Sequence, residues 1–138
     1  MGRALHTRRK VLGQLLDHAR RQPHRECCGL LAGRDGAITM ALPAENVAAD
    51  PKKSYEIAPA QTIGLMRELR ERGLGFLGIY HSHPSSENVP SQRDIALAYY
   101  SDAAYFIITP RPYAEKPVRA FSIREGRVAE LDLQILAD

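Results

Sequence analysis

Two histidines and an aspartate at short spacing are the residues of this sequence best suited to chemistry. His81 and His83 follow the apolar run 76–80 and precede Pro84. Residues two apart on a strand point to the same face, so both imidazoles can reach one ion. Asp94 comes after a short loop that lets it fold back over them. Two imidazoles and a carboxylate are typical of catalytic zinc, because a fourth position stays open for water.

The serine and aspartate also have a purely structural interpretation. Ser91-Gln92-Arg93-Asp94 fits the broad Ser-x-x-Asp form of a helix capping box. A His-x-His pair alone is equally compatible with an ordinary strand end that faces solvent. Short motifs match often by chance, so neither half is convincing by itself. The combination of both halves indicates a metal site.

The complete pattern resembles the signature of the JAMM (MPN-plus) metalloprotease family. That signature is His-x-His-Pro, six residues, then Ser-x-x-Asp, and residues 81–94 match it without a gap. The family also carries a glutamate near the first strand before a Cys-Gly-Leu segment, and Glu26 precedes Cys27-Cys28-Gly29-Leu30 here. The resemblance runs from the first expected helix to the strand near Ile123, which is most of the chain.

This resemblance implies an α/β (α+β) fold, with a mixed β-sheet flanked by helices as in the cytidine-deaminase-like MPN fold, in one domain over residues 1–138. It implies one Zn²⁺ ion held by His81, His83 and Asp94. Glu26 would accept a proton from the attacking water, and Ser91 would hydrogen-bond the oxyanion. Without the histidine motif, Glu26 is better interpreted as an exposed residue at a strand entrance.

The resemblance also implies a substrate class. Compact prokaryotic members of the family act on ubiquitin-like proteins, including small sulfur carriers, so we expect a peptidase or isopeptidase that cleaves after a C-terminal Gly-Gly. Glycines let a backbone pass close to a metal, and an extended tail can add beside a sheet edge. The alternative is a non-catalytic MPN scaffold that binds a protein partner. A zinc nucleoside deaminase needs a Pro-Cys-x-x-Cys pair, which the sequence lacks.

Three helices follow from the spacing of apolar residues. Helical periodicity predicts an amphipathic helix that ends near Arg21. Pro59 can open a second helix, which ends near Gly73. A third is expected from Ser91 through Tyr99.

Strands are expected where apolar residues run together or alternate between turn residues. The run 76–80 is bounded by glycines and a proline and predicts a buried central strand. Other strands are expected over 27–32, 38–42, 55–57, 105–109, 119–123 and 128–135, with loops over 46–53 and 110–117. Strands interleaved with helices favour an α/β or α+β sheet domain over a helix bundle.

Composition excludes several classes of protein. A chain of 138 residues with 44% hydrophobic and 25% charged residues suits one globular domain, not a disordered or collagen-like chain. Its longest apolar stretch, 73–80, is far shorter than the roughly 18 residues of a spanning helix, so we expect no membrane partner. The net charge of +3 forms no basic stripe with interleaved aromatics, so we expect no nucleic-acid partner.

The two cysteines and the other three histidines give weaker indications of function. Cys27 and Cys28 are the only cysteines and are adjacent, which is a poor arrangement for a disulfide. We expect buried, reduced strand residues and a cytoplasmic protein. His6, His18 and His24 lack partners at ligand spacing and are expected at the surface or at helix ends.

Overall fold

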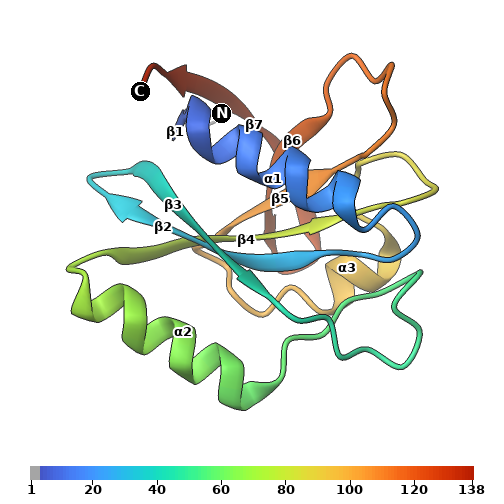
Figure 1. The fold of residues 1–138 in the computed structure, drawn as a ribbon, viewed down its shortest axis with the longest axis horizontal. Coiled ribbons are helices and arrows are strands. Elements are labelled where there is room, and N and C mark those ends of the chain that lie inside the picture. Colours follow the sequence, from blue (N-terminus) through green and yellow to red (C-terminus); the bar gives the residue numbers. More distant parts are fainter. Residues whose placement is uncertain (1–3) are drawn as a thin grey trace.

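A mixed sheet that closes on itself organises the protein, whose computed structural model describes residues 4–138 (Figure 1). The strands are β1 (Ala4–Arg8), β2 (Cys28–Arg34), β3 (Ala37–Ala44), β4 (Gly75–Ser82), β5 (Ala104–Ile108), β6 (Val118–Arg124) and β7 (Arg127–Leu136). The helices are α1 (Arg9–Arg21), α2 (Pro59–Glu71) and α3 (Gln92–Ala96). The expected mixed sheet with helices is confirmed. The expected domain range 1–138 includes residues 1–3, which lie outside the described residues.

The strand order is β1-β3-β2-β4-β5-β6-β7, and parallel pairing of β1 with β7 closes the sheet. β2 and β3 form the expected hairpin, whose turn residues Asp35 and Gly36 have φ angles of 54° and 76°. Such positive φ values are those of the tight hairpin turns that Asp-Gly favours. β4 lies between β2 and β5, so the apolar run 76–80 is a central strand as predicted.

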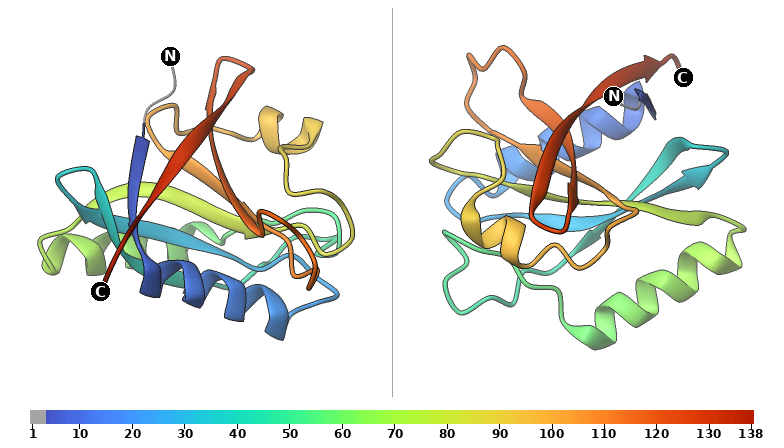
Figure 2. Two further views of the ribbon diagram at one scale, coloured as in Figure 1. Left: turned by 90° about the horizontal axis from the view of Figure 1, so that it is seen from above. Right: turned by 180° about the vertical axis from the view of Figure 1, so that it is seen from behind.

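Helices cover both faces of the strongly curled sheet (Figure 2). Val11, Leu15 and Ala19 of α1 are buried at helical spacing and pack in one core cluster with Leu31 of β2. The neighbouring β2 residue Leu30 packs on the other side, in the cluster that contains residues of α2. This alternation is what the period of a strand requires. Among the described residues, no helix is long and apolar enough to cross a membrane.

Three elements differ from the sequence expectations. β1 was not expected, because its residues pair with β7 at the far end of the chain. The segment 55–57 is not a strand. Its backbone accepts one hydrogen bond from the preceding segment, from the Val47 N–H to the Glu56 carbonyl at 2.8 Å, and this bond is not part of a sheet ladder. The third helix ends at Ala96 instead of Tyr99, because residues 97–103 turn away to enter β5.

His18 fits its expectation as a helix-end histidine but is not at the surface. It lies in the last turn of α1 but is buried, and its Nδ1 is 2.8 Å from the Tyr80 hydroxyl oxygen. This contact joins the helix to the central strand, and burial lowers the pKa of His18. His6 and His24 are exposed as expected.

Two glycines should respond to alanine in opposite directions. At Gly29 in β2 a Cβ would lie 2.5 Å from the Leu42 carbonyl oxygen and 2.5 Å from the Tyr80 ring. Gly29→Ala should therefore lower the free energy of unfolding by about 1–3 kcal/mol, as overpacked cores do. Gly13→Ala, at an exposed position of α1 where a Cβ meets nothing within 4 Å, should raise it by about 0.5–1 kcal/mol. Urea unfolding checks both, and equal effects would contradict the close β2–β4 packing.

Candidate active site

The two histidines stand where the central strand ends. His81 is within β4, and His83 follows the last strand residue. The His83 backbone N–H still donates to the Ile108 carbonyl of β5 at 2.9 Å, so the strand path continues through it. Because residues two apart on a strand share a face, both imidazoles point to the same side, and their Nε2 atoms lie 3.2 Å apart. The sequence prediction that they converge is confirmed.

The glutamate reaches the site through the pairing of β2 with β4. Cys27 N–H donates to Ser82 Oγ at 2.8 Å, and Ser82 N–H donates to the Cys27 carbonyl at 3.1 Å. These two bonds extend the antiparallel register past the pair Cys28 and His81. Continuing the same register by one residue brings Glu26 level with His83. Opposite residues in an antiparallel pair share a face, so Glu26 belongs to the face of the histidines.

The aspartate is positioned by a very short helix. Ser91 Oγ accepts from the Asp94 N–H at 3.0 Å, and Asp94 Oδ2 accepts from the Ser91 N–H at 3.0 Å. This is a complete capping box at the start of α3. The structural interpretation of the Ser-x-x-Asp pattern is therefore correct. It does not exclude the metal interpretation, because the same Oδ2 atom also faces both histidines.

The three side chains form a compact triangle of ligand atoms. Asp94 Oδ2 lies 3.2 Å from His81 Nε2 and 3.0 Å from His83 Nε2. In a tetrahedral zinc site with bonds of about 2.0–2.1 Å, neighbouring ligand atoms are roughly 3.3 Å apart. The donor set and its spacing therefore fit a zinc ion, and both histidines are buried.

Contacts behind the histidines orient their rings. His83 Nδ1 is 2.7 Å from the Glu87 carbonyl oxygen. A carbonyl only accepts, so Nδ1 carries a proton, and Nε2 is the nitrogen that can bind an ion once it has lost its own proton. The His81 ring stacks on Tyr55 with centroids 4.5 Å apart and planes at 22°. Among the described residues His81 Nδ1 has no hydrogen-bond partner, so this stacking and its strand position hold the ring.

The charge state of the three ligand residues follows from their mutual contacts. Burial alone would raise the pKa of Asp94, but hydrogen bonds from His81 and His83 hold it below its usual value. Burial lowers the pKa of His81. Burial also acts to lower the pKa of His83, but the Asp94 carboxylate and the Glu87 carbonyl outweigh it and raise that pKa. The site therefore favours an ionised carboxylate beside imidazole nitrogens.

Glu26 is buried without a compensating partner at one oxygen. It is 3% exposed, which argues against its interpretation as an exposed strand-entrance residue. Burial raises its pKa to about 8, with smaller opposing effects that include His83. Oε1 has no hydrogen-bond partner among the described residues. A buried carboxyl with a pKa near neutrality is suited to taking up and releasing a proton.

Two residues at the site were not expected from the sequence. Tyr55 covers His81, and the buried Asn46 binds the Glu26 carbonyl through its side-chain amide at 3.0 Å. Both belong to the segment between β3 and α2, and no spacing pattern links them to the histidines. Cys27 and Cys28 are buried and free as expected, and burial raises their thiol pKa values to about 11 and about 12. They are therefore unsuited to nucleophilic chemistry.

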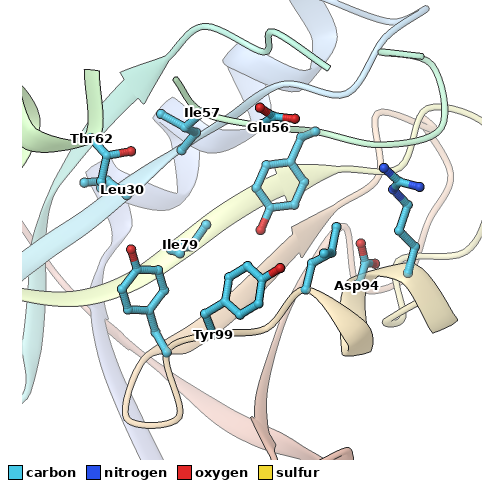
Figure 3. Close-up of a pocket in the computed structure, with 11 residues that line it drawn as sticks. Leu30, Glu56, Ile57, Thr62, Ile79, Asp94 and Tyr99 are labelled. Carbon is cyan, nitrogen blue, oxygen red and sulfur yellow. The ribbon is translucent and has the colours of Figure 1, made fainter. Parts of the chain in front are cut away.

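A pocket of about 350 Å³ opens beside the ligand triangle. Figure 3 shows Asp94 toward one end, with Ile79 and Leu30 of the sheet and the ring of Tyr99 farther along. Tyr99 is 77% exposed, so the rim carries apolar surface that the fold leaves uncovered. The pocket gives a polypeptide room to lie next to the site.

Comparisons with known proteins agree with this geometry. A family model described as prokaryotic homologs of the JAB domain matches residues 8–124. A desampylase of Haloferax volcanii is 39% identical over 102 residues, covering 70% of this chain and 73% of that protein. A probable TtuB-protein conjugate cleaving protease of Thermus thermophilus is 33% identical over 130 residues, covering 94% of this chain and 83% of that protein.

The fold is matched as well. The solution structure of protein DSY2949 from Desulfitobacterium hafniense superposes with a TM-score of 0.86 at 29% identity, covering 97% of this chain and 94% of that one. The family match extends from the last residue of β1 to the last residue of β6 and includes every residue of the candidate site. The chain therefore belongs to the prokaryotic JAB-domain (JAMM) family and is a hydrolase that acts on peptide or isopeptide bonds.

Proposed function

We propose that this protein is a zinc-dependent peptidase or isopeptidase that hydrolyses the bond after the C-terminal Gly-Gly of a ubiquitin-like, sulfur-carrier type protein. The observation that carries the proposal is the ligand triangle of His81, His83 and Asp94 with the buried Glu26 on the same face. The names of the relatives support the substrate class, since the Thermus protein is a probable TtuB-protein conjugate cleaving protease.

Each residue has a defined task in this proposal. His81, His83 and Asp94 would hold the ion, and a bound Zn²⁺ would act as a Lewis acid that lowers the pKa of water from 15.7 to roughly 7. Glu26 accepts the proton of the attacking water and passes it to the leaving amine nitrogen as the C–N bond breaks. Ser91 Oγ already accepts from Asp94, so its hydroxyl hydrogen is free to donate to the carbonyl oxygen as that oxygen becomes negative.

The proposed substrate is recognised in two parts. Glycines at the cleaved end carry no Cβ, so the tail can pass close to the buried histidines. The pocket beside Asp94 offers an apolar wall for the residues that precede them. Ordering a flexible tail costs conformational entropy, so the globular body of the carrier supplies most of the affinity.

Metal binding tests the ligand set. His81→Ala, His83→Ala and Asp94→Ala should each lower zinc affinity, because a site with two protein ligands is incomplete. Zinc content measured by mass spectrometry after dialysis should be about one equivalent for the wild type. Asp132→Ala, at an exposed position of β7, is the control and should retain zinc. Unchanged metal content in all three ligand variants would refute the site.

Glu26→Gln tests the proton acceptor. The amide keeps the shape of the side chain but cannot take up a proton, so turnover should fall by roughly 10² to 10⁴ while zinc stays bound. The measurement is steady-state turnover at equal zinc content. Near-normal turnover would assign proton transfer to another group.

The same variant reports on the buried charge of the metal-free protein. Burial raises the pKa of Glu26 to about 8 in the folded protein, from 4.5 in the unfolded chain. The unfolded chain therefore loses this proton at a lower pH than the folded protein does. The free energy of unfolding consequently falls as the pH rises between these two values. Metal-free Glu26→Gln should therefore be more stable than wild type by roughly 2–4 kcal/mol at pH 7.5 and nearly equal to it at pH 4.5. A pH-independent difference would contradict the buried, shifted carboxyl.

Cleavage of defined fusions tests the substrate class. Zinc-loaded protein is incubated with a ubiquitin-like carrier extended past its Gly-Gly, and separately with the isolated tail peptide, and products are weighed by mass spectrometry. Cleavage directly after the second glycine, at least about tenfold faster for the intact carrier, is expected because its body adds binding surface. Equal cleavage of arbitrary unstructured peptides would reject a ubiquitin-like carrier as the specific substrate but would still be consistent with a peptidase.

A further inference from the structure

Asn46 lies buried in the segment between β3 and α2, with 6% of its surface exposed. Its Nδ2 donates to the carbonyl oxygens of Glu26 and Ser54, each at 3.0 Å. Its Oδ1 accepts from the N–H groups of Ala48 at 3.0 Å and Glu56 at 3.1 Å. Both amide hydrogens and both acceptor positions are thus used, which is the full capacity of an asparagine side chain.

These bonds connect two parts of the site that are distant in sequence. The Glu26 N–H donates to the Pro51 carbonyl at 2.7 Å, so both backbone groups of Glu26 bind the segment that Asn46 organises. On the other side, the bonds of Asn46 flank Tyr55, whose ring stacks on His81. One side chain therefore holds the backbone of the glutamate and the residue that covers a ligand ring.

We propose that Asn46 is a positioning residue that sets the direction of the Glu26 carboxylate by fixing its backbone carbonyl to the segment 46–56. This inference rests on the proposed function, in which Glu26 accepts the proton. Glu26 Oε1 has no hydrogen-bond partner among the described residues, so that atom has no anchor of its own. The direction of the carboxylate then depends on the backbone that carries it, and a small misplacement of a catalytic group is costly in rate.

Asn46→Asp is the sharpest variant. It keeps the shape of the side chain but replaces the two N–H donors by an oxygen that faces the carbonyls of Glu26 and Ser54, so two attractive contacts become repulsive. Asn46→Ala removes the bonds without repulsion and serves where Asn46→Asp folds poorly. Leu5→Ala is the matched control for lost stability. Leu5 is 6% exposed on β1 and packs in the core cluster that contains α1 residues, and no residue of that cluster lines the pocket beside Asp94.

The first readout separates turnover from binding. With zinc content equal, Asn46→Asp should lower kcat on the carrier fusion by about 10- to 100-fold, a part of the loss expected on removing the base itself, with KM changed less than about threefold. Leu5→Ala should leave kcat within about threefold while lowering the melting temperature at least as much. An equal loss of kcat in both variants, or loss of zinc from Asn46→Asp, would overturn the proposal.

The second readout is a double-mutant cycle with Glu26→Gln. If Asn46 acts through Glu26, adding Asn46→Asp to Glu26→Gln should lower kcat by no more than about threefold further, because the group it positions is already disabled. Losses that multiply would show that Asn46 acts independently of Glu26 and would overturn the proposal.

The third readout does not depend on activity. In the metal-free protein, Asn46→Asp should speed amide hydrogen exchange in the segments 25–28 and 46–56 by about tenfold or more relative to β6, and Leu5→Ala should not. Unchanged exchange at Glu26 would overturn the proposed restraint. If zinc-loaded wild type hydrolyses no carrier or peptide, the proposed function fails, and this exchange measurement still decides whether Asn46 holds Glu26.

Discussion

The antiparallel register between β2 and β4 is the constraint on which the site depends. The pair Cys27 and Ser82 exchanges two hydrogen bonds beyond the last ladder pair. This register brings Glu26 level with His83 on one face. Because side chains alternate along a strand, a slip by one residue would turn the glutamate and the histidines to opposite faces. Gly29, which pairs with Tyr80 in this register, lies so close to the Tyr80 ring that no Cβ fits there.

Asp94 shows how one carboxylate serves the fold and the chemistry together. A helix as short as α3 has little stability of its own, since helix nucleation is unfavourable. Its capping box with Ser91 stabilises the first turn and aims Oδ2 at the histidines. The two sequence interpretations of the Ser-x-x-Asp pattern are therefore not alternatives. The Asp94 carboxylate that caps the helix is the same group that faces the histidines.

The predictable parts of this protein are those encoded in local spacing. The ligands share one short segment, and glycines and prolines mark the ends of the central strand, so His81, His83 and their strand could be placed from the sequence. β1 could not, because only pairing with β7 makes it a strand. Tyr55 and Asn46 could not be linked to the site either, since they reach it through space from an irregular segment. Helical periodicity also overestimated the length of α3, because Tyr99 lies in an exposed irregular segment after the helix.

Closure of the sheet has a consequence for how the chain folds. The pairing of β1 with β7 joins Ala4 to Asp132 and Arg8 to Leu136, so nearly the whole chain forms the loop that must close. Loop-closure entropy makes such distant pairing late and slow compared with the β2–β3 hairpin. Until it forms, β1 and β7 are open strand edges that can pair with other chains. Nascent chains are thus most prone to aggregate before their last strand emerges, although the strands that carry the histidines and Glu26 can already be paired.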